Sequence, residues 1–127
     1  MINQYAAMLA AVVLGCVIGF QVLLAAGMPL GRAAWGGQYV VLPAKLRLGS
    51  VAAAGILGLA LWVVLARAGL AAPGGASTII RVAAWVFGGY FGLNTLGNLA
   101  SKSALERMVM TPATLVLAAC FVTVALT

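Results

Sequence analysis

Four apolar runs dominate the sequence, and each is long enough to cross a lipid bilayer as a helix. They cover residues 5–27, 46–66, 79–100 and 108–126. A helix needs about 20 mostly apolar residues to span the hydrocarbon layer, and its backbone polar groups must be hydrogen-bonded internally there. The sequence therefore predicts an all-α fold, with residues 1–127 forming a single integral membrane domain, a four-helix transmembrane bundle.

The scarcity of charge supports this prediction. Of the 127 residues, 65% are hydrophobic and only 6% are charged, whereas a soluble domain has about 25% charged residues. The net charge of +6 is scattered between the apolar runs. It forms no basic stripe, so it indicates membrane topology rather than nucleic-acid binding. The expected partners are the lipid bilayer and either a second copy or another membrane protein.

The positions of Lys and Arg predict the orientation. The first and third connections carry Arg32, Lys45, Arg47, Lys102 and Arg107, and the second carries Arg67 and Arg81. Because cytoplasmic connections hold the excess of basic residues, we expect these two connections in the cytoplasm and both termini outside. The run at 72–75 predicts a turn. Thr111 and Pro112 suit the first positions of a helix and suggest where the regular part of the fourth crossing begins.

Two pairs of segments suggest an internal repeat. VLGCVIGFQVL at 13–23 matches VFGGYFGLNTL at 86–96, and VVLPAKL at 40–46 matches VMTPATL at 109–115. The matched helices run in the same direction, which would make the bundle two parallel-repeat helical hairpins. Chance is the alternative, because Gly, Val and Leu are abundant in the chain.

Small residues spaced four apart predict helix contacts, because they let two helices approach closely in lipid. The candidates are Gly15 and Gly19, then Ser50, Ala54 and Gly58, and finally Gly88 and Gly92.

Amide side chains form the candidate polar site. Tyr90, Asn94 and Asn98 share one face of the third crossing, and an amide facing lipid would leave its polar atoms unsatisfied. Gln21 and Asn94 each lie about 7 Å past the middle of their crossings, so we predict one polar cluster in the inner half of the bundle. The cluster either holds helices together by hydrogen bonds or lines a cavity that binds a solute.

A second candidate lies at the inner interface, where Arg32, Trp35, Lys45 and Arg47 combine basic and aromatic side chains. They could hold an anionic lipid head group, or they could only anchor the helix ends.

The chain has few side chains that could act in catalysis. The chain has no His and no Asp, and its one acid, Glu106, falls in an expected connection. General acid–base catalysis and hard metal ions both depend on such side chains, so we expect no enzyme, no catalytic residue, no cofactor and no metal site. The chain is expected to be a non-catalytic membrane component or subunit. The alternative is a small-solute or ion transporter or channel.

The motifs GRAAWGG, VLPAKLRLGS and NTLGNLASKSALERMVMTP resemble a group of small four-crossing bacterial membrane proteins of uncharacterised function. The resemblance spans nearly the whole chain. It implies a multi-pass protein of the bacterial inner membrane and no particular activity.

Overall fold

The computed structural model describes residues 2–70 and 77–127, and in these residues it is all-helical. The long helices are α1 (Ile2–Ala25), α2 (Ala44–Arg67), α3 (Thr78–Leu99) and α4 (Ala104–Leu126), with the short 3-10 helices η1 (Gly31–Ala33) and η2 (Trp35–Gly37) between α1 and α2. All four long helices are long and apolar enough to cross a membrane. The predicted all-α bundle with four crossings is therefore confirmed, whereas the turn predicted at 72–75 lies outside the described residues.

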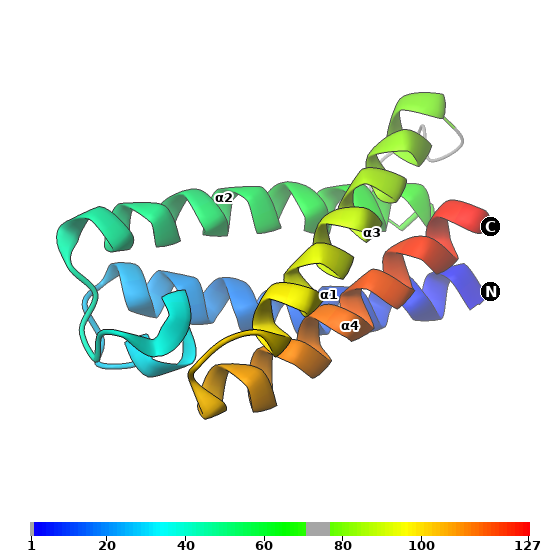
Figure 1. Cartoon of the computed structure of the whole chain (residues 1–127). Coiled ribbons are helices and arrows are strands. Elements are labelled where there is room, and N and C mark those ends of the chain that lie inside the picture. The colour runs from blue at the N-terminus through cyan, green and yellow to red at the C-terminus, as the bar shows by residue number, and fades with distance from the viewer. Residues whose placement is uncertain (1, 71–76) are drawn as a thin grey trace.

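The helices pack as two antiparallel hairpins, α1 with α2 and α3 with α4. The hairpins meet mainly where α4 lies beside α1, and α2 contacts α3 less extensively. Figure 1 shows both ends of the chain at one end of the bundle and α3 running obliquely to α1 and α2. The end that holds the two 3-10 helices and the α3–α4 connection is called the loop end below.

The core fills the half of the bundle nearest the chain termini. Small side chains such as Ala7, Ala60 and Ala84 are fully buried there and let the helices approach closely. Phe121 is also fully buried, and its ring centroid lies 5.3 Å from that of Phe91. Lipid gives helices no hydrophobic drive to associate, so this close packing is what holds the half together.

Two arginines, from α2 and α3, bind C-terminal carbonyls of α4, which no intrahelical N–H can satisfy. Arg67 Nε donates to the Val124 carbonyl at 3.0 Å, and Arg81 Nε donates to the Ala125 carbonyl at 3.1 Å. The ends of α2 and α4 and the start of α3 are thereby tied together near the termini.

The fourth helix begins earlier than its proline suggests. Ser103 is its N-cap, and its side chain accepts a hydrogen bond from the Glu106 N–H at 3.2 Å. Pro112 lies inside α4. The prediction that Thr111 and Pro112 begin the regular helix is therefore wrong, and the fourth crossing has 23 residues.

The glycine pattern marks a helix contact at only one of its positions. A Cβ on Gly88 would lie 3.2 Å from Val122 Cγ2, so α3 and α4 pack closely at this glycine. Gly15, Gly19 and Gly58 are exposed. A Cβ on any of these three would meet nothing within 4 Å, so the predicted contacts at these glycines are absent from the described fold.

The other predicted packing positions, Gly92, Ala54 and Ser50, differ in how deeply they are buried. Gly92 is half-buried, and a Cβ there would also meet nothing within 4 Å, so its predicted contact is absent too. Ala54 is half-buried and Ser50 is fully buried.

The second half of the proposed repeat has no structural counterpart. Pro43 is the N-cap of α2, whereas Pro112 lies well inside α4. Gln21 and Asn94, from the first half, do occupy similar positions near the ends of α1 and α3. The repeat therefore extends at most to the first helix of each hairpin.

Candidate functional site

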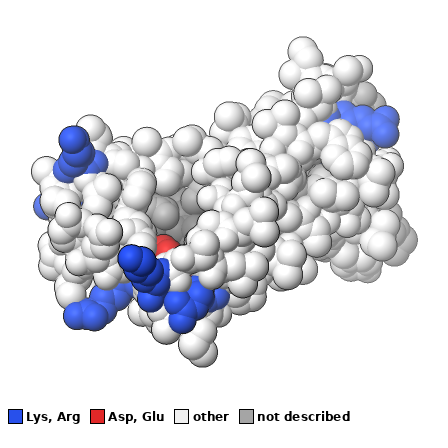
Figure 2. Space-filling view, in the orientation of Figure 1, with Lys and Arg blue, Asp and Glu red and all other residues white. Residues whose placement is uncertain are grey.

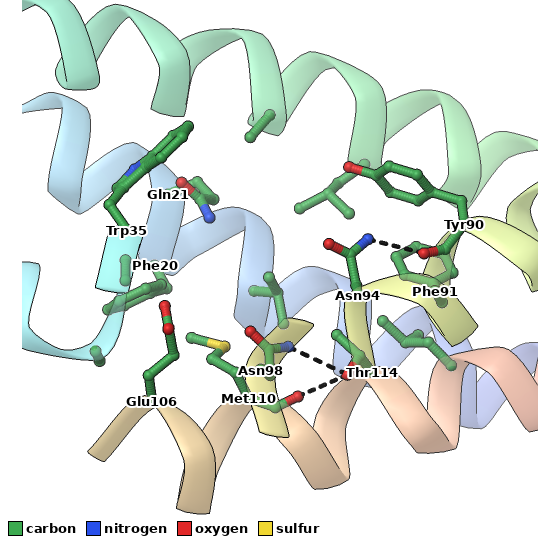
Figure 3. Close-up of a pocket in the computed structure, with 16 residues that line it drawn as sticks. Phe20, Gln21, Trp35, Tyr90, Phe91, Asn94, Asn98, Glu106, Met110 and Thr114 are labelled. Carbon is green, nitrogen blue, oxygen red and sulfur yellow. Dashed lines mark hydrogen bonds between the residues drawn. The ribbon is translucent and has the colours of Figure 1, made fainter. Parts of the chain in front are cut away.

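A cavity of about 220 Å³ lies between the four helices and is covered at one side by the 3-10 segment. Figure 3 shows its lining, in which side chains from all four helices converge. The polar lining residues are Gln21, Tyr90, Asn94, Asn98, Glu106 and Thr114. Aromatic and aliphatic side chains make up most of the remainder, so the cavity combines an apolar wall with a few polar groups, as small-molecule sites do.

The cavity occupies the loop-end half of the bundle only. It extends from Trp35 and Glu106, at the loop end, to Leu57, Phe91 and Leu117, which lie near the middles of their helices. These three side chains are buried, and the packed core lies beyond them. In the part of the chain that the structure describes, the cavity is therefore a dead end rather than a passage.

The structure brings the four predicted polar residues to this one cavity, although it does not bond them to one another. Asn94 Nδ2 donates to the Tyr90 carbonyl of its own helix at 3.0 Å. Gln21 Oε1 is buried and has no hydrogen-bond partner among the described residues. The two amides face each other across the cavity in Figure 3, and an acceptor left unsatisfied inside a protein is costly.

Asn98 belongs to a network that joins α3 to α4. Its Nδ2 donates to Thr114 Oγ1 at 3.3 Å, and Thr95 Oγ1 donates to the same oxygen at 3.0 Å. Thr114 Oγ1 in turn lies 2.9 Å from the Met110 carbonyl. Asn98 therefore joins two helices by a hydrogen bond, which is one of the two interpretations of the amides given above. Among the described residues, Gln21 and Asn94 make no hydrogen bond to another helix.

Glu106 and Thr114 are polar cavity residues that the sequence did not predict, and Glu106 is the charged one. Glu106 is only 8% exposed, but its carboxylate oxygens reach the open hollow and are not buried as Gln21 Oε1 is. No hydrogen bond or ion pair joins them to a described residue. Figure 3 shows the carboxylate directed toward the ring of Phe20, and Figure 2 shows the only acidic atoms of the chain within a hollow. In a capping box, a glutamate here would bond the N-cap N–H. The Ser103 N–H instead donates to Ser101 Oγ at 3.1 Å, which leaves the carboxylate for the cavity.

Trp35 covers the loop end of the cavity. Its Nε1 donates to Ser50 Oγ at 3.2 Å, and a Cβ on Gly49 would lie 3.0 Å from its ring. The backbone turns tightly at Trp35 and Gly36, which both have positive φ. This turn brings the Trp35 ring over the cavity. Trp35 was proposed as an interface anchor, and its ring also forms part of the cavity wall.

The other proposed anchors lie outside the cavity. Arg32 and Lys45 are exposed, and the Arg32 carbonyl accepts a hydrogen bond from Ser103 Oγ, which joins the 3-10 segment to the start of α4. Arg47 Nε donates to the Ala25 carbonyl at 2.9 Å and so satisfies the end of α1. The lipid head-group site stays a prediction.

Chemically, the cavity offers amide and hydroxyl groups, one carboxylate and aromatic faces. Within residues 2–70 and 77–127, no group of three or more His, Cys, Asp or Glu side chains could hold a metal ion. Comparison with protein-family models, with characterised proteins and with solved structures found no match. The fold and the site together define a class of protein: a helical bundle with four helices that could cross a membrane, and a cavity in one half of the bundle that combines an apolar wall with a few polar groups.

Proposed function

We propose that this protein binds a small polar solute in the cavity and carries it across a membrane. The observation behind the proposal is the unpartnered polar lining, above all Gln21 Oε1 and the Glu106 carboxylate. Polar groups inside a membrane protein are expensive when unsatisfied and usually mark a solute or ion pathway. A solute that donates hydrogen bonds to Gln21 Oε1 and to the Glu106 carboxylate would give both groups the partner that they lack among the described residues.

The dead end favours a carrier over an open channel. A channel needs a continuous polar path, whereas here Leu57, Phe91 and Leu117 close the cavity near mid-bundle. A carrier holds its solute near the membrane midplane and opens to one side at a time. In the described form, the cavity opens on the side of the bundle, in the half near the loop end.

A non-catalytic membrane component is the second candidate function. The bonds from Asn98 and Thr95 to Thr114 support it, because they join helices without needing a ligand. The exposed glycines of α1 would then face a second copy or a partner protein. We place either form of the protein in the bacterial inner membrane, with both termini outside.

Solute flux into sealed vesicles tests the two candidates. Purified full-length protein is reconstituted, and swelling of the vesicles is followed with small neutral, zwitterionic and cationic solutes. Asn94→Leu should abolish protein-dependent flux while the bundle stays assembled. Gln4→Leu is the matched control, because Gln4 is an exposed amide of α1 that does not line the cavity. Flux no greater than in empty vesicles for every solute would overturn the carrier proposal in favour of the second candidate.

A further inference from the structure

We infer that the solute is a small organic cation, an ammonium compound, whose positive charge is held by Glu106. The inference rests on the proposed function and names the class of solute that this cavity selects. It starts from the isolation of the carboxylate, which belongs to the only acid in the chain, a residue that is 8% exposed. A charge held mostly away from water is stabilised by a partner of opposite sign.

No described residue forms an ion pair with the carboxylate, although Figure 2 shows basic side chains at the edge of the hollow. Among the described residues that line the cavity there is no Lys or Arg, although Arg107 follows Glu106 directly in the sequence. Arg107 is exposed, and its Nη1 donates to the Ser101 carbonyl at 2.6 Å. The N-terminus of α4 favours a negative charge in its first turn, but a helix end does not remove the need for a counter-charge inside a cavity. A cationic solute in the cavity would supply the positive charge that no described cavity-lining side chain supplies.

The wall around the carboxylate favours an organic cation over a metal ion. Phe20 and Trp35 line the cavity near Glu106, and Tyr90 and Phe91 line it farther in. Aromatic faces attract ammonium groups, most strongly where water is excluded. Metal ions such as Ca²⁺ instead require six or more oxygen ligands, and this cavity provides one carboxylate. Its volume of about 220 Å³ equals the share of roughly seven water molecules, which suits a small organic molecule.

The amides suit the other end of such a solute. Gln21 Oε1 is a buried acceptor without a partner, and it lies across the cavity from Asn94. A hydroxyl or amine on the solute could donate to Gln21. We therefore expect an ammonium group near Glu106 and Trp35, and a hydrogen-bonding group near the amides.

Fluorescence of Trp35 measures the binding directly. In a Trp62→Phe, Trp85→Phe background, which removes two exposed tryptophans, Trp35 is the sole remaining tryptophan reporter among the three of the chain. The protein is titrated with choline chloride, with its neutral analogue 3,3-dimethyl-1-butanol, and with NaCl. Choline should change the signal saturably, and the other two should not. Choline and its analogue differ in charge at one atom, so the comparison isolates the role of the carboxylate.

Substitutions at Glu106 provide the second arm. Glu106→Gln should weaken choline binding by about thirtyfold or more, as expected when one partner of a buried charge pair is lost. Glu106→Asp keeps the charge and should weaken binding less. Met108→Lys changes the net charge by the same amount as Glu106→Gln on an exposed position and should leave binding unchanged. Circular dichroism of each variant shows whether the helices are retained.

The outcomes separate this inference from the proposed function. Equal affinity for choline and its neutral analogue, unchanged binding in Glu106→Gln, or saturation by Na⁺ alone would each overturn the cation inference, while solute flux lost in Asn94→Leu would still support a carrier. Choline binding that depends on Glu106 without any flux would support the cation site and overturn transport. Absence of binding by every probe would overturn the inference.

Discussion

Trp35 on the 3-10 segment donates a hydrogen bond from Nε1 to the hydroxyl of Ser50 on α2, at a distance of 3.2 Å. Ser50 is fully buried, whereas the indole remains 43% exposed. This bond helps to hold the connection between α1 and α2 over the cavity, together with the bond from Ser103 to the Arg32 carbonyl. One wall of the candidate site therefore depends on a pair of residues that are far from the site's asparagines in sequence.

The fit of the Trp35 ring gives the first prediction. Gly49→Ala places a methyl group 3.0 Å from the ring, so the indole should shift and its bond to Ser50 should break. Gly55→Ala is the control, because a Cβ there meets nothing within 4 Å. With Trp35 as the only tryptophan, its emission should move to longer wavelength in Gly49→Ala alone. Identical spectra for the two variants would show that the ring is not held in this position.

The threonine network between α3 and α4 gives the second prediction. Thr114→Val removes the oxygen that receives bonds from both Asn98 and Thr95, and we expect a loss of about 1–2 kcal/mol in bundle stability. Thr123→Val removes a hydroxyl that bonds only to the Ala119 carbonyl of its own helix and should have little effect. Unfolding in a denaturing detergent, followed by loss of helicity, compares the two. If Thr123→Val lowers the stability of the bundle more than Thr114→Val does, the interhelical role of Thr114 is wrong.

Two glycines of the same sequence pattern should respond differently to substitution. Gly88→Val drives a larger side chain into Val122 and Phe121, and overpacking of this kind costs about 1–3 kcal/mol. Gly15→Val adds the same atoms to an exposed position with nothing within 4 Å. The same detergent titration should destabilise only the first variant. Strong destabilisation by Gly15→Val would mean that another molecule covers that face of α1.

The orientation in the membrane is tested by labelling. In a Cys16→Ala, Cys120→Ala background, Lys102→Cys should react with a membrane-impermeant maleimide only from the cytoplasmic side. Thr78→Cys, at the other end of the bundle, should react only from outside. Both residues are exposed. The reverse pattern would overturn the orientation inferred from the basic residues.

The crossings could be predicted because they depend on local properties. Apolar length fixes the number of spans, and the spacing of Tyr90, Asn94 and Asn98 follows from helical periodicity alone. Both rules need only neighbouring residues. This is why the polar face of α3 could be located before its partners were known.

Glu106 escaped prediction because the fourth crossing was predicted to begin at residue 108, which placed Glu106 in the preceding connection. The pattern Ser103-x-x-Glu106 is that of a helix N-terminus and would have placed the carboxylate on a helix. Its burial, however, depends on the 3-10 segment and on α1, which no local pattern specifies. Of the predicted glycines, only Gly88 lies at a helix contact in the described fold, because the spacing of glycines defines a smooth face but not what covers it.

The arginine bonds at the far end have a consequence for any transport cycle. Arg67 and Arg81 hydrogen-bond to carbonyls in the last turn of α4, so α2, α3 and α4 are joined at the end of the bundle away from the cavity. If the protein carries a solute as proposed, release at this end requires both of these hydrogen bonds to break. Two guanidinium groups and the C-terminal end of α4 would then control opening, at the opposite end of the bundle from the residues that line the cavity.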